Sequence, residues 1–97
     1  MRSKIKMYLE IISPEAILYQ GEVKSISFPG SYGDFQVLDN HAPIVSTLKK
    51  GKVKIQGKMS INKEVKKYFN VSDKETFLDI NSGTVEMSNN NVTLLID

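Results

Sequence analysis

The chain has 97 residues, no cysteine, one histidine and a net charge of +2. This length predicts a single domain over residues 1–97. Without cysteine there are no disulfides and no thiolate metal sites, which suits a reducing compartment, and one histidine is too few for the usual zinc clusters. The small net charge does not by itself indicate nucleic acid, and no apolar run is long enough to cross a bilayer.

The N-terminal third predicts short strands. Residues 1–6 are basic like the start of a signal peptide, but Glu10 and Pro14 interrupt the apolar stretch that follows, so no secretory leader is expected. Alternating apolar side chains predict a strand over residues 7–12, which Pro14 ends. A brief second strand is expected at residues 17–19, before Gly21.

The next segment combines turn residues with apolar runs. A strand is predicted over residues 23–28, where apolar spacings of three and then two suggest a β-bulge or a change of face. Gly30 and Gly33 then favour a tight turn, because glycine adopts φ > 0 without strain. A strand with Phe35 and Val37 on one face follows. After a His-Ala-Pro corner, residues 44–48 are short enough to form either a strand or one helical turn.

In the second half, lysines alternate with Val53 and Ile55, which predicts an amphipathic strand with its lysines in water. Residues 61–71 leave two alternatives open. Residues 66–71 pair with residues 76–80 across a turn at 72–75, or residues 63–69 form a helix; strands are favoured because the neighbouring segments are β-rich. A hairpin with its turn at residues 89–91 ends the chain.

This pattern predicts an all-β fold, a two-sheet β-sandwich of roughly ten short strands. Eight residues are expected in its core: Phe28, Phe35, Val37, Leu38, Val53, Ile55, Val85 and Leu94.

Residues 49–67 carry eight lysines and a single acid, Glu64. Such a segment can bind phosphate, acidic lipid or an acidic partner. The favoured interpretation is a set of solvated strand faces with lysine protecting the edges, because no aromatic platform for single-stranded nucleic acid is interleaved with the lysines. No nucleic acid partner is therefore expected.

The residue inventory predicts no catalytic site and no cofactor. The chain has no phosphate-binding Gly-x-x-x-x-Gly-Lys-Ser/Thr loop, and the two glycines at 30 and 33 suit a hairpin turn better than a phosphate cradle. His41, Asp39 and a serine could be written as a triad, but no nucleophile elbow supports it. From physics alone, His41 either stiffens its corner by binding a backbone carbonyl or contacts a partner. Asp34 is read as a turn residue.

One ordered set of segments resembles a known family. The run from Phe28-Pro-Gly to Val37-Leu, followed by His41-Ala-Pro-Ile, is similar to the N-terminal domain of the epsilon subunit of the F-type ATP synthase. Five further segments match in order, with a weak stretch at residues 59–74. They are Leu9-Glu-Ile-Ile-Ser-Pro14, Leu18-Tyr-Gln-Gly-Glu-Val23, Leu48-Lys-Lys-Gly-Lys-Val-Lys-Ile55, Ser82-Gly-Thr-Val-Glu-Met87 and Asn91-Val-Thr-Leu-Leu-Ile-Asp97.

The resemblance implies a non-catalytic rotor subunit of a proton- or sodium-driven synthase, which couples the gamma shaft to the membrane c-ring. It implies a peripheral location on the cytoplasmic face of the bacterial membrane, held through the complex. Five residues would contact the polar loops of the c-ring: Ser31, Tyr32, Gly33, Asp34 and His41. The gamma-contacting residues cannot be transferred, because residues 59–74 depart from the family pattern. The alternative is a free-standing β-sandwich that binds a ligand or nucleic acid.

A departure from the family concerns the end of the chain. Epsilon subunits usually continue into two antiparallel helices, whereas this sequence stops at Asp97. The helical segment is therefore expected to be absent, and its inhibitory action is expected either to be absent or to come from another subunit. The family's ATP motif, Ile/Leu-Asp-x-x-Arg-Ala, retains only Ile96 and Asp97 here. Because the arginine that would meet phosphate is missing, no ATP binding is expected.

Overall fold

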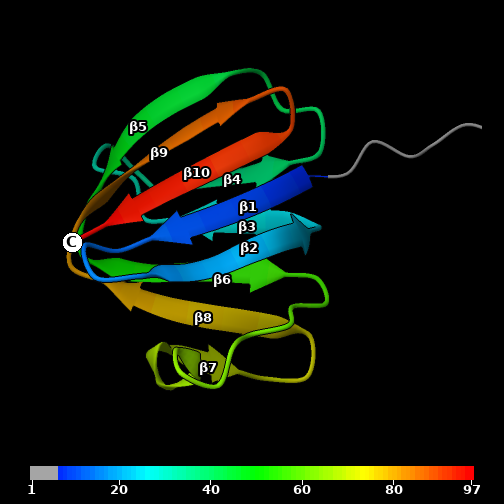
Figure 1. The fold of residues 1–97 in the computed structure, drawn as a ribbon. Coiled ribbons are helices and arrows are strands. Elements are labelled where there is room, and N and C mark those ends of the chain that lie inside the picture. The colour runs from blue at the N-terminus through cyan, green and yellow to red at the C-terminus, as the bar shows by residue number, and fades with distance from the viewer. Residues whose placement is uncertain (1–6) are drawn as a thin grey trace, which may run out of the picture.

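The computed structural model describes residues 7–97, so the basic start at residues 1–6 lies outside the described residues. Ten strands form two five-stranded sheets, which Figure 1 shows as two layers. The predicted two-sheet β-sandwich is confirmed. The strands are β1 (Met7–Ile12), β2 (Ile17–Val23), β3 (Ser25–Phe28), β4 (Phe35–Leu38), β5 (Ile44–Leu48), β6 (Gly51–Gln56), β7 (Phe69–Val71), β8 (Glu75–Ile80), β9 (Gly83–Ser88) and β10 (Asn91–Ile96).

The strand order of the first sheet is β2-β1-β10-β9-β5, and that of the second sheet is β4-β3-β6-β8-β7. All strand pairs are antiparallel except β1 with β10, which are parallel. Residues 44–48, for which a strand and a helical turn were both open, form strand β5 at the edge of the first sheet. Within residues 7–97, no helix is long and apolar enough to cross a membrane.

The predicted single strand over residues 23–28 is wrong. Strand β2 ends at Val23 in the first sheet, Lys24 is a bend, and β3 begins at Ser25 in the second sheet. The Lys24 N–H donates to the Gln56 carbonyl at 2.7 Å, which fixes this crossing. The irregular apolar spacing therefore marks a change of sheet, with Val23 and Ile26 buried from different sheets, and not a bulge within one strand.

The core lies between the sheets and consists of inward-facing side chains from both. Of the eight predicted core residues, six are buried and Phe35 packs partly buried against them. Leu38 is wrong: it is 52% exposed. Because side chains alternate along a strand, burial of Val37 on β4 directs the next residue outward. The most deeply buried large side chains are Phe28, Met7, Leu9, Ile11, Ile26, Ile55, Leu78, Met87 and Leu94.

The favoured prediction that residues 66–71 form a strand paired with residues 76–80 is confirmed only for residues 69–71. A 3₁₀ helix, η1 (Lys66–Tyr68), precedes a three-residue strand β7, and only β7 pairs with β8. Val65 and Phe69 flank the helical turn and are both buried, so one turn brings two apolar side chains to the core. The predicted turn at 72–75 is confirmed by the Ser72 N–H, which donates to the Glu75 carbonyl at 2.8 Å.

Candidate functional site

The turn between β3 and β4, residues 31–34, projects from one end of the sandwich (Figure 1). The Gly33 N–H donates to the Gly30 carbonyl at 3.1 Å and closes the turn. Gly33 has φ +133°, which favours glycine. Tyr32 has a fully exposed ring (102%), and Ser31 and Asp34 are also exposed. Four of the predicted site residues therefore share one protruding turn.

Bonds to the edge strand β5 hold this turn in place. The Ser31 N–H donates to the Thr47 carbonyl at 3.0 Å, and the Thr47 hydroxyl donates to the Ser31 hydroxyl at 2.9 Å. Beneath the turn, the rings of Phe28 and Phe35 pack with centroids 5.4 Å apart. A Cβ at Gly30 would lie 2.9 Å from the Phe35 ring, so the glycine permits this close packing. The turn is exposed at its tip and fixed at its base.

His41 lies at the other end of the sandwich. Its neighbour Asn40 donates its N–H to the Asn90 side chain, in the turn that follows β9, at 2.8 Å. Ser31, by contrast, is bonded to Thr47, which pairs with Thr84 near the start of β9. Figure 1 shows the two loops at opposite ends of β4. The structure therefore separates His41 from the other four predicted site residues.

The His41 ring is tied to its own corner. Its Nδ1 lies 2.7 Å from the Ala42 carbonyl oxygen, and its backbone N–H donates to the Leu38 carbonyl at 3.1 Å. A carbonyl only accepts, so Nδ1 carries the proton and donates. This contact supports the interpretation that His41 stiffens the corner, while its half-buried ring retains surface for a partner.

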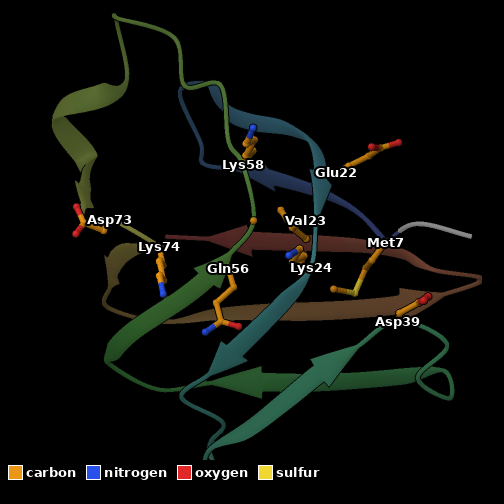
Figure 2. Close-up of a pocket in the computed structure, with 10 residues that line it drawn as sticks. Met7, Glu22, Val23, Lys24, Asp39, Gln56, Lys58, Asp73 and Lys74 are labelled. Atoms are coloured by element: carbon orange, nitrogen blue, oxygen red, sulfur yellow. The ribbon is translucent and has the colours of Figure 1, made fainter. Parts of the chain in front are cut away.

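A cleft of about 770 Å³ opens between the sheets at the end that carries His41's corner (Figure 2). Side chains of both charge signs surround it, so neither sign dominates the cleft. Among residues 7–97, no cluster of histidine, aspartate or glutamate is arranged to hold a metal ion. The charged residues that line the cleft are Glu22, Lys24, Asp39, Lys58, Asp73 and Lys74.

The lysine-rich segment 49–67 spreads over several elements. On β6, the Lys52 amine lies 2.9 Å from the Asp79 carboxylate, and the Lys54 amine lies 3.6 Å from the Glu75 carboxylate, both on β8. Exposed pairs of this kind contribute about 0–1 kcal/mol each, so they moderate the local positive charge more than they stabilise the fold. This arrangement supports a solvated strand face.

Sequence reasoning missed the exposed apolar side chains on the outer face of the first sheet. Ile17, Val45 and Leu95 are 53%, 77% and 47% exposed. The sequence did contain a signal for these exposed side chains, because β1 and β10 carry apolar residues on both faces. Ile12 and Leu95 face away from the core, next to buried residues in the same strands. One-sided burial predicts polar residues at such positions.

Comparison with known proteins identifies the family. The sequence model of the protein family described as "ATP synthase, Delta/Epsilon chain, beta-sandwich domain" matches residues 6–97. The chain belongs to this family. An ATP synthase epsilon chain of Leptospira interrogans is 39% identical over 92 residues, which are 95% of this chain and 61% of that protein. One from Nitratiruptor is 38% identical over 90 residues, 92% of this chain and 59% of that protein.

The chain thus spans about 60% of the length of these epsilon-chain relatives. Solved structures share the fold at low sequence identity. A chain of the Euglena gracilis mitochondrial ATP synthase, in a structure of OSCP, F1 and c-ring, matches with a TM-score of 0.71 at 16% identity, covering 99% of this chain and 53% of that one. A chain from the central stalk and c-ring structure of the Tetrahymena thermophila mitochondrial enzyme matches with a TM-score of 0.69 at 18% identity, covering 98% and 66%.

Proposed function

We propose that this chain serves as an epsilon-type central-stalk subunit of a proton- or sodium-driven ATP synthase. It holds the gamma subunit against the c-ring and takes no part in catalysis. The observation that carries the proposal is a protruding turn on a rigid two-sheet domain of this family. Torque passes through such a domain because packed protein interiors have low compressibility. The chain lies at the cytoplasmic face of a bacterial membrane, peripheral through its partners.

The ring contact in this proposal centres on the turn of Ser31, Tyr32, Gly33 and Asp34. Its exposed Tyr32 ring offers a large contact area for polar ring loops, and tyrosine suits interfaces because it combines an apolar body with a hydroxyl. The Asp34 carboxylate orients basic groups, and an exposed pair of this kind contributes about 0.2–1 kcal/mol. His41, at the far end of β4, joins this contact only if ring loops lie along β4.

Cysteine cross-linking tests the ring contact directly, since the chain has no cysteine of its own. Tyr32→Cys is expected to form a disulfide with a single cysteine in the polar loop of the ring, within the assembled complex. Gln36→Cys, exposed in the middle of β4, and His41→Cys map how far the contact extends. Cross-linking of His41→Cys without Tyr32→Cys would assign the ring to the other end of the sandwich and refute the proposed contact.

A further inference from the structure

The chain between β6 and β8, residues 57–74, contains five lysines against two acids, so its net charge is positive. Its 3₁₀ helix, η1, is anchored on both sides, because the flanking residues Val65 and Phe69 are buried in the core. The three residues of the helix, Lys66, Lys67 and Tyr68, are all exposed. This basic turn of Lys66, Lys67 and Tyr68 therefore presents two ammonium groups and a phenol ring to solvent from a fixed base.

The lysines of the basic turn differ from those of β6. Lys52 and Lys54 lie beside acids of β8, whereas neither Lys66 nor Lys67 forms an ion pair with an acid among residues 7–97. The Lys67 amine instead lies 5.4 Å from the centroid of the Tyr68 ring, and Tyr68 is 51% exposed. The face of an aromatic ring attracts a cation without neutralising its charge. Both ammonium groups therefore remain available to an anion outside the chain.

The basic turn lies at the same end of the sandwich as the β3–β4 turn (Figure 1). Strand β7 is antiparallel to β8 and aligns Phe69 with Leu78, so the residues before Phe69 lie toward Ile80 at the end of β8. Ile80 aligns with Gly51 of β6, and a Cβ on Gly51 would lie 2.8 Å from the side chain of Pro29, which precedes the β3–β4 turn. Four strand spacings separate β4 from β7, so the two turns lie about 19 Å apart across the sheet.

We propose that the basic turn binds the anionic phospholipid headgroups of the membrane beside the ring, without inserting into the bilayer. This inference rests on the proposed function, in which the end of the sandwich with the β3–β4 turn faces the ring and therefore the membrane. Each lysine near an anionic surface strengthens adsorption about fivefold, which applies to Lys66 and Lys67. Tyr68 suits the headgroup level, because its ring is apolar and its hydroxyl stays in water.

Other anionic partners fit the basic turn less well. A protein partner needs an apolar centre from which water is excluded, and Tyr68 alone is too small for one. Single-stranded nucleic acid needs several aromatic rings on which successive bases stack, and the turn has one. A nucleic acid duplex offers the same phosphates, but the turn lies at the end of the domain that faces the membrane in the proposed function. A lipid surface needs only exposed positive charge at that end.

Sedimentation of the whole chain with vesicles tests the inference. Vesicles of phosphatidylcholine with phosphatidylglycerol are expected to bind the chain, more weakly at physiological than at low salt, and vesicles of phosphatidylcholine alone are expected not to bind it. Lys66→Glu combined with Lys67→Glu is expected to weaken binding by about 25-fold or more, since it removes two attractive charges and adds two repulsive ones.

Lys58→Glu combined with Lys74→Glu is the matched control. Both lysines are exposed, belong to the same segment and line the cleft at the opposite end of the sandwich. The length of β8, about 17 Å, separates that end from the basic turn, which exceeds the Debye length of about 8 Å at physiological salt. The control changes the net charge by the same amount, and we expect it to bind within about twofold of wild type.

The outcomes decide between lipid and other anions. A loss confined to the variant at Lys66 and Lys67 supports the lipid contact. No binding to the anionic vesicles, or equal losses for the variant and its control, refutes it. Displacement from vesicles by inorganic phosphate at constant ionic strength would assign the turn to a free anion. Tighter binding to duplex DNA than to vesicles, abolished by the same variant, would assign it to nucleic acid; either result overturns the inference.

The vesicle assay contains neither gamma nor the ring, so the lipid contact and the rotor role can fail separately. Vesicle binding by a chain that does not bind gamma would refute the rotor role, whereas gamma binding without vesicle binding would refute the lipid contact. Thermal unfolding checks that each variant remains folded. Lys66→Gln combined with Lys67→Gln removes the charges without reversing them and replaces the double reversal if that variant does not fold.

Discussion

The Asn90 side-chain amide donates a hydrogen bond of 2.9 Å to the Asp39 carboxylate. Its carbonyl oxygen accepts the Asn40 N–H at 2.8 Å, so one buried side chain joins the β9–β10 turn to the corner that follows β4. This pairing links residues 50 and 51 positions apart in the chain. It fixes the corner that carries His41.

Replacing Asn90 with alanine should therefore destabilise the fold by about 1–3 kcal/mol, because it removes two hydrogen bonds, one of them to the charged carboxylate of Asp39. Asn89→Ala is the matched control. Both residues have positive φ, 52° and 63°, so both substitutions strain the turn. Urea unfolding measures the difference, and equal losses for the two variants would show that the hydrogen bonds contribute nothing.

The two glycines of the β3–β4 turn should respond differently to alanine. A Cβ at Gly33 meets nothing within 4 Å, so Gly33→Ala carries only the strain of φ +133°, about 1–3 kcal/mol. A Cβ at Gly30 would lie 2.5 Å from the Gly33 carbonyl oxygen and 2.9 Å from the Phe35 ring. Gly30→Ala should therefore destabilise the domain more, and a smaller loss in urea unfolding than for Gly33→Ala would contradict this packing.

Tyr19 should make the fold sensitive to alkaline pH. Burial raises the pKa of its hydroxyl above the ordinary value of 10.0, with smaller effects from Tyr8 and Glu22. The folded state thus holds the proton more tightly than the unfolded state. The contribution of the protonated Tyr19 to the free energy of unfolding is present below about pH 10 and is lost as the pH rises through the folded-state pKa.

Tyr19→Phe should accordingly lose less stability above pH 10 than wild type, although it also loses the 3.1 Å hydrogen bond to the Glu22 carbonyl. Thermal unfolding between pH 8 and about pH 11 measures this difference. The two proteins share every other ionisable group, so the difference between their profiles isolates Tyr19. Identical pH profiles would mean that Tyr19 ionises equally in both states.

In the proposed ring contact, Tyr32 should matter more than Asp34. Tyr32→Ala removes a fully exposed ring that would be buried in the complex, and large aromatic side chains dominate interface energetics. Asp34→Asn removes only an exposed charge, with an effect of about 0.2–1 kcal/mol that falls as salt is raised. Retention of each variant on isolated c-rings compares the effects of the two substitutions on binding. A greater loss for Asp34→Asn would indicate an electrostatic anchor.

The alternation of apolar and polar side chains along the strands was sufficient to predict the sandwich and most of its core, because each strand buries one face. The crossing at Lys24 was not predictable, since its N–H bond partner is the Gln56 carbonyl, far along the chain. The 3₁₀ turn at η1 likewise depends on Val65 and Phe69 meeting a core built by other segments.

The candidate site shows the same limit. Local turn chemistry predicted the tight turn at Gly30 and Gly33, and the family resemblance grouped residues 31–34 with His41 as one contact. The position of His41 depends on strand β4, which carries the chain to the opposite end of the sandwich. The exposed apolar side chains on the outer face of the first sheet come from strands β2, β5 and β10, and only the sheet order, which the sequence alone does not reveal, places these strands in one sheet.

A calorimetric titration of this chain against gamma from the same organism, at low and physiological salt, tests the rotor assignment most directly. Saturable one-to-one binding is expected at both salt concentrations. Absence of saturable binding at either salt would contradict the rotor role and leave a family fold without its proposed partner.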